Sequence, residues 1–124
     1  MADRLVDSMK LRFLKNSLRL RVNRREVEAL AAGRELSERV TFGGGATLAY
    51  TLVPTFDAKS TAEFDGRVIR VTAPLNDWAR GAEIGFYFDV EPGLKVAVEK
   101  DLECVDGPAD ERDPDAYPRS AKTC

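Results

Sequence analysis

Two stretches near the N-terminus, residues 10–14 and 17–22, alternate apolar with basic side chains. A period of two is typical of β-strands that have one apolar and one polar face. Asn16 and Ser17 lie where the stretches meet, and they fit either a bulge in one long strand or a tight turn between two strands. We expect the bulge, and therefore a single bent strand.

The period changes to that of a helix after residue 22. Asn23 precedes Glu26 by three residues, which is the spacing of a capping box, and the apolar residues within 27–31 then fall on one helical face. Gly33 predicts the end of this helix because glycine readily adopts the left-handed backbone that follows a helix.

The remaining chain predicts strands that are joined mainly as hairpins. Gly43–Gly45 connects one pair, and Asp65-Gly66 is the strongest two-residue hairpin signal in the sequence. Pro74 and Gly81 bracket a short helical turn that contains Trp78, which we expect in the core. The expected strands are 35–42, 46–53, 62–64, 67–72, 83–90 and 94–100.

About seven strands and one main helix define an α+β domain with a mostly antiparallel sheet. A sheet with a helix across one face and a partly closed barrel both fit this pattern. A chain of 124 residues buries enough surface for one hydrophobic core. We find no internal repeat, and we expect an N-terminal extension over 1–8, one domain over 9–104 and an acidic tail over 105–124. Met9 is an alternative start of the native chain.

The charge balance narrows the classes of partner. The chain has 19 basic and 21 acidic residues, a net charge of −2, which argues against a general nucleic-acid binder. It has no apolar run suited to a bilayer and no secretory signal at its start, so we expect a cytoplasmic protein with no membrane partner. Residues 1–25 carry eight bases and two acids, whereas residues 99–124 carry four bases and eight acids.

Candidate chemistry centres on the basic strand face. Lys10, Arg12, Arg19 and Arg21 are expected to project from one side of the sheet, where they would form a ligand-binding site for a phosphate or carboxylate group. The alternative is a solvated face, or one paired with acidic side chains of a neighbouring strand. Glu99 and Asp101 are the expected acidic counter-face.

The sequence excludes the usual forms of several enzyme classes. No histidine is present, so the commonest general base and the commonest metal ligand are both missing. The residues after Asp101 do not follow the spacing of a calcium loop. We therefore expect no metal, no cofactor and no catalytic residue, although an enzyme that uses Glu99 or Asp101 as a base beside Arg19 or Arg21 is an alternative.

The two cysteines, Cys104 and Cys124, are too few for a disulfide framework. A reducing cytosol would keep both as thiols. A bridge between them in an oxidised sample stays open as the alternative.

Three segments together resemble a family of short uncharacterised bacterial proteins. The segments are KLRFLKNSLRLRVNRREV from residue 10, VTFGGGATLAYTL from residue 40 and VEKDLEC from residue 98. The resemblance covers Met9 to Cys104 and implies a bacterial origin and a shared domain of unknown function. It implies no activity.

These observations favour a binding or interaction module that uses its basic strand face. The ligand would be a partner protein or a small anionic molecule. Two alternatives remain from the residues alone: the histidine-free carboxylate enzyme, and a structural homo-oligomer, for example a homodimer, that associates through a strand edge.

Overall fold

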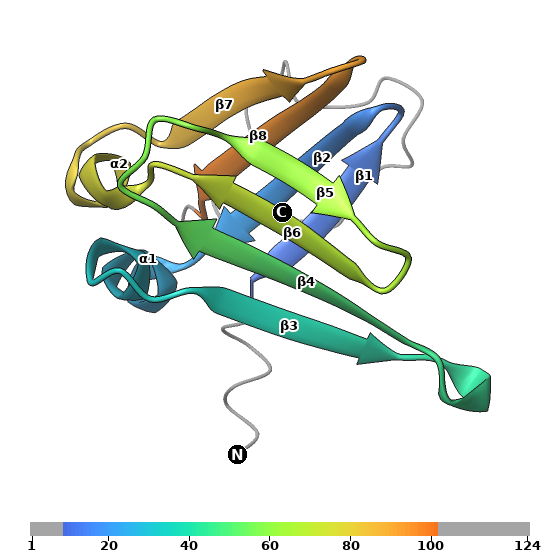
Figure 1. Ribbon diagram of the computed structural model, residues 1–124. Helices are drawn as coiled ribbons and strands as arrows, with labels where there is room; N and C mark the ends of the chain where they lie inside the picture. Colours follow the sequence, from blue (N-terminus) through green and yellow to red (C-terminus); the bar gives the residue numbers. More distant parts are fainter. Residues whose placement is uncertain (1–8, 102–124) are drawn as a thin grey trace, which may run out of the picture.

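The computed structural model describes residues 9–101. Eight strands form two four-stranded sheets that pack around a shared core, and two α-helices lie together at one end (Figure 1). This confirms the α+β class with mostly antiparallel pairing, and it corrects the single sheet and the partly closed barrel to two separate sheets. The elements are β1 (Lys10–Leu14), β2 (Ser17–Val22), α1 (Arg24–Ala31), β3 (Leu36–Thr41), the 3-10 helix η2 (Gly43–Gly45), β4 (Thr47–Pro54), β5 (Thr61–Phe64), β6 (Val68–Ala73), α2 (Asn76–Arg80), β7 (Gly85–Val90) and β8 (Leu94–Lys100).

The first basic stretch and the second are two strands and not one bent strand. Leu14 pairs with Ser17 in an antiparallel hairpin, so the expected bulge is wrong. The turn forms because Lys15 adopts a positive φ of 52°, with Asn16 completing the two-residue connection. Lysine at that position is not a turn signal, since a positive φ is uncommon for any residue but glycine or asparagine.

Helix α1 begins and ends where the sequence predicts. The Asn23 side chain accepts a hydrogen bond from the backbone N–H of Glu26 at 2.8 Å, and the Glu26 carboxylate accepts one from the backbone N–H of Asn23 at 2.9 Å. Gly33 follows the helix with a φ of 85°. Leu30 on the inner face is fully buried, so the helix covers the core at this end.

The chain runs through the same topology twice, although no repeat is evident in the sequence. A hairpin, a helix and a second hairpin make up residues 10–54, and the same order returns over residues 61–100. Each sheet takes one hairpin from each half, in the orders β1-β2-β8-β7 and β3-β4-β6-β5. In both sheets the outer pairs are antiparallel and the central pair is parallel.

The register of the strands is repeated as well. Leu20 pairs with Val98 in one sheet and Val71 pairs with Leu52 in the other, and all four side chains are fully buried. We call two residues equivalent when they hold the same register position in the two halves. The complete rows are Leu11, Leu20, Val98 and Phe86 in the first sheet and Ala62, Val71, Leu52 and Leu36 in the second.

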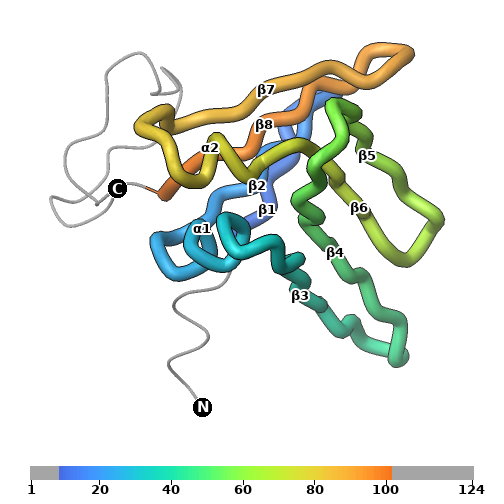
Figure 2. The backbone as a smooth tube through the Cα atoms, turned by 60° about the vertical axis from the view of Figure 1, so that its left-hand side comes forward, coloured from blue at the N-terminus to red at the C-terminus, as the bar shows by residue number. Residues whose placement is uncertain are grey.

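The two helices close one end of the space between the sheets (Figure 2). Arg80 of α2 donates to the backbone oxygen of Ala31 in α1 at 3.0 Å. Trp78 is 6% exposed, which confirms its expected place in the core, and the ammonium group of Lys100 lies 4.9 Å from its ring centroid. The opposite end of the sheets carries the strand turns, including the short 3-10 helix η2 between β3 and β4, and no α-helix lies over it among residues 9–101.

Candidate functional site

Four cationic side chains gather on the outer face of the sheet that contains β1 and β2. Lys10 lies directly opposite Arg21, and Arg12 lies directly opposite Arg19. They share this face because the intervening residues of β2, including Leu18 and Leu20, point inward and are buried. All four predicted ligand-binding residues are thus neighbours in space.

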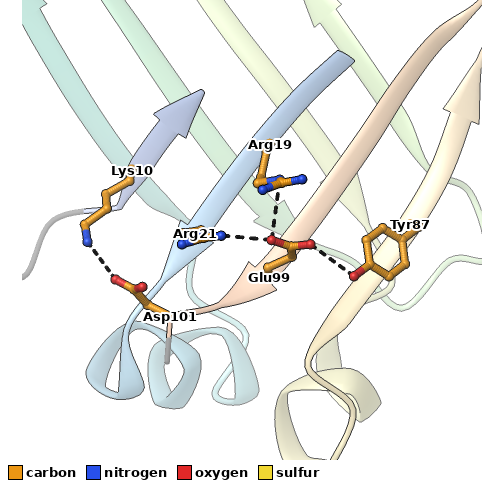
Figure 3. A network of polar contacts seen from close by, with 6 residues as sticks. All are labelled: Lys10, Arg19, Arg21, Tyr87, Glu99 and Asp101. Atoms are coloured by element: carbon orange, nitrogen blue, oxygen red, sulfur yellow. Dashed lines mark hydrogen bonds and ion pairs between the residues drawn. The ribbon is translucent and has the colours of Figure 1, made fainter. Parts of the chain in front are cut away.

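The acidic side chains come to this face from the neighbouring strand. β8 runs parallel to β2, and Glu99 is the register partner of Arg21. One oxygen of Glu99, Oε1, lies 3.4 Å from Nε of Arg19 and 3.6 Å from Nε of Arg21 (Figure 3). The side chain of Glu99 is only 15% exposed, so it is the most enclosed member of this group.

Tyr87 completes the surroundings of this carboxylate from β7. Its hydroxyl donates to Oε2 of Glu99 at 3.0 Å, so both carboxylate oxygens have partners. Gly85 makes room for the contact, because a Cβ there would collide with the hydroxyl and ring of Tyr87. The alternation of β7 places Tyr87 on the other face of the strand from Phe86 and Phe88. Its contact with Glu99 depends on the strand order, which the sequence pattern does not give.

Lys10 and Asp101 form a second, more exposed pair. The ammonium nitrogen of Lys10 lies 2.9 Å from Oδ2 of Asp101. Asp101 follows the last residue of β8 and is held there by a hydrogen bond from its backbone N–H to the oxygen of Val22. The expected acidic counter-face is therefore interleaved with the basic residues on one surface.

Arg12 stands apart from these pairs. Within residues 9–101, no carboxylate lies within ion-pair distance of its guanidinium group. Its cross-strand neighbour is another cation, Arg19. Four cations and two carboxylates leave this part of the surface with an excess of positive charge, and that excess is concentrated toward Arg12.

A separate pocket opens at the end of the sheets that faces away from α1 and α2. Its volume is about 320 Å³, and its walls come from the turn-proximal ends of strands in both sheets. Neither the basic side chains nor the two carboxylates described above contribute to it. The lining residues are Phe13, Leu18, Leu48, Ala62, Glu63, Phe64, Ile69 and Leu94.

Comparison with known families adds a classification. The model of DUF7009, a family of unknown function, matches residues 9–121. The chain belongs to this family. The match confirms the resemblance to a family without known activity and begins at Met9, while the bacterial origin stays a prediction. The search of curated proteins gives no match.

In this DUF7009 member, Glu99 accepts a hydrogen bond from Tyr87 and contacts two guanidinium groups. The residues of the alternative carboxylate enzyme therefore lie together, and the use of Glu99 as a base stays a prediction. Residues 9–101 hold no group of three side chains suited to a metal ion.

No helix within residues 9–101 is long and apolar enough to cross a membrane. Cys104, Cys124 and the expected terminal segments lie outside the described residues.

Proposed function

We propose that this domain is a non-catalytic interaction module that binds an acidic, extended segment of a partner protein along β1. The observation that supports this is the pairing of cation opposite cation, Lys10 with Arg21 and Arg12 with Arg19. Like charges directly opposite on neighbouring strands destabilise a sheet. Glu99 and Asp101 offset part of this repulsion. A carboxylate of a partner beside Arg12 would offset the rest.

A protein segment suits this surface better than a small anion does. Small-molecule sites are concave and enclose most of their ligand, whereas these cations stand on the outer face of a sheet. β1 is also an edge strand, since β2 is its one neighbour among residues 9–101. The edge of β1 that faces away from β2 offers backbone N–H and C=O groups to which an added strand can bind.

The alternation of β1 defines which segment would fit. Lys10 and Arg12 point to the outer face, whereas Leu11 points to the inner face. A strand that pairs with β1 would therefore place every second side chain beside the cations. Acidic residues at those positions and apolar residues between them would match both faces of the sheet.

The test uses a fluorescent peptide of alternating Glu and Val. Its control is a blocked peptide of the same composition, in which the Glu residues form one run and the Val residues another. We expect fluorescence anisotropy to show saturable binding of the alternating peptide, weakened by salt. Arg12→Glu and Arg19→Glu should each lower the affinity at least tenfold. Arg70→Glu is the matched control, because Arg70 is the equivalent of Arg19 on the other sheet and should not matter.

Four outcomes would contradict the proposal. Equal binding of the blocked peptide, or equal loss with Arg70→Glu, would indicate general charge attraction. Binding of inorganic phosphate or citrate that depends on Arg12, without peptide binding, would indicate a small-anion site. Sedimentation that shows a dimer dissociated by Arg12→Glu would indicate the homo-oligomer instead.

A further inference from the structure

The lining of the pocket repeats the symmetry of the fold. Phe13 pairs with Leu18 in one half and Phe64 pairs with Ile69 in the other, so these are equivalent positions. Leu48 and Leu94 are equivalent too, because each pairs with a valine of an edge strand. Leu48 pairs with Val40, and Leu94 pairs with Val90. Six of the eight lining residues thus form three equivalent pairs, and the pocket lies where the two halves of the chain meet.

The side chains that form the pocket are almost entirely apolar. Glu63 is the one lining residue with a charged side chain. Leu18 and Ile69 are buried and mark the inner part, whereas Phe13 and Phe64 are 59% and 61% exposed and mark the mouth. Water in such a pocket finds few hydrogen-bond partners, although an ordered water needs two to four. An apolar occupant that displaces this water gains free energy.

The size of the pocket indicates the kind of occupant. A volume of about 320 Å³ lies at the lower end of the range, roughly 300–1,000 Å³, in which proteins bind small organic ligands. A second copy of the chain is a poorer candidate, because stable interfaces use about 20–30 residues on each side. Eight residues that line a concavity provide too little surface for that.

We propose that this pocket binds a small, uncharged apolar molecule, such as one with an aromatic ring or a short alkyl chain. Phe13 and Phe64 would hold it from two sides at the mouth, and the buried pair Leu18 and Ile69 would contact its inner end. The site is independent of the basic face, since Lys10 and Arg12 point away from the space between the sheets.

The test uses the uncharged fluorophore N-phenyl-1-naphthylamine, which has no group for the basic face. We expect saturable fluorescence enhancement with one site per chain, and a higher unfolding temperature at saturating probe. Phe13→Ala and Phe64→Ala should each weaken the affinity by roughly two- to tenfold, the loss typical of one aromatic contact. Phe56→Ala is the matched control, because Phe56 is 89% exposed and lies outside the pocket.

A pair of filling variants tests the position of the probe. Leu48→Trp and the equivalent Leu94→Trp place a large side chain in the pocket and should abolish binding, with folding checked by circular dichroism. If neither variant folds, the two exposed phenylalanines decide the question, because their substitution leaves the core intact. Arg12→Glu should leave the probe affinity unchanged, so that this proposal and the proposed function can fail separately.

The opposite results would overturn the inference. They are the absence of saturation, the same loss with Phe56→Ala as with Phe13→Ala, and unchanged affinity in a folded Leu48→Trp variant. A dimer that dissociates on Phe13→Ala or Phe64→Ala would also overturn it, because a second copy would then cover the mouth.

Discussion

Leu20 and Val71 hold the same register position in the two halves of the molecule, and neither side chain is exposed. Each is paired with a residue of the other half, Leu20 with Val98 and Val71 with Leu52. Neither half can therefore complete a sheet or bury its central row alone. This arrangement makes the two halves one cooperative folding unit despite the repeated topology.

Truncation of either central residue should destabilise the whole domain. We expect Leu20→Ala to lower the free energy of unfolding by about 2–5 kcal/mol, since it leaves a cavity between the sheets. Val71→Ala removes two methyl groups and should cost about 2 kcal/mol. Urea denaturation followed by tryptophan fluorescence and by circular dichroism should give one coincident transition in each variant.

Two outcomes would contradict this account of the core. Separate transitions for the two halves would show that they fold independently. A loss with Val40→Ala as large as with Leu20→Ala would also contradict it, because Val40 is 42% exposed and should change stability by less than about 0.5 kcal/mol.

The local elements could be read from the sequence because their signals are local. Alternation placed the strands, and the spacing of Asn23 and Glu26 placed the start of α1, since both patterns involve residues close in the chain. The strand order could not be read this way. The parallel pairing of β2 with β8 joins Arg21 to Glu99, and no short-range pattern reports a contact over such a separation.

The repeated topology could not be recognised in the sequence, because a buried position constrains the volume and polarity of its side chain more than the residue type. Leu20 and Val71 are equivalent but differ, and at the neighbouring position Val96 is the equivalent of Tyr50. The pocket could not be predicted from the sequence for a related reason. Phe13 and Phe64 are each a single exposed aromatic in the sequence, which is common on protein surfaces, and only the register of two sheets makes them a pair.

The capping box of α1 should contribute measurably to stability. Asn23→Ala removes the acceptor for the backbone N–H of Glu26, so we expect a loss of about 1 kcal/mol, within the usual range of 0.5–2 kcal/mol. Asn23→Asp keeps an acceptor at the same place and should retain most of the stability. Thermal or urea denaturation measures both, and equal losses in the two variants would show that the cap is unimportant.

Tyr50 should make the fold sensitive to alkaline pH. Burial, followed by the charges of Glu38 and Glu26, raises the pKa of Tyr50 above its ordinary value of 10.0. The folded state therefore favours the neutral phenol, whose hydroxyl donates to the backbone oxygen of Met9 at 2.9 Å. This contribution to stability is complete below pH 10 and is lost as the pH rises from there through the pKa of the folded state.

Ultraviolet titration of tyrosinate checks this prediction. Tyr50 should ionise above its ordinary pH range in the wild-type protein, and the late transition that it contributes should be missing in Tyr50→Phe. The substitution should also flatten the loss of stability above pH 10, at the expense of one hydrogen bond, about 1 kcal/mol. A late transition that survives Tyr50→Phe would assign it to another residue.

Glu99 links stability to the proposed binding. Glu99→Gln removes the negative charge beside Arg19 and Arg21 but can keep an acceptor for Tyr87. We expect the free energy of unfolding to fall by about 1 kcal/mol, below the range of about 1.5–3 kcal/mol for hydrogen bonds to charged groups, because solvent screens the partly exposed guanidinium groups. Added salt should reduce this loss. Asp89→Asn is the control, since its pair with Lys95 is largely exposed and should contribute little.

The same substitution should raise the affinity for the alternating acidic peptide, because Glu99 competes with the peptide for Arg19 and Arg21. The loss of one negative charge would then lower the stability of the fold and raise its affinity for the peptide. This is expected where a surface carries charges that favour a partner at the expense of stability. Anisotropy titration of Glu99→Gln and Asp89→Asn against the same peptide measures the difference. Weaker binding by Glu99→Gln would mean that Glu99 positions the arginines for the partner, and unchanged binding would place the peptide elsewhere on the surface.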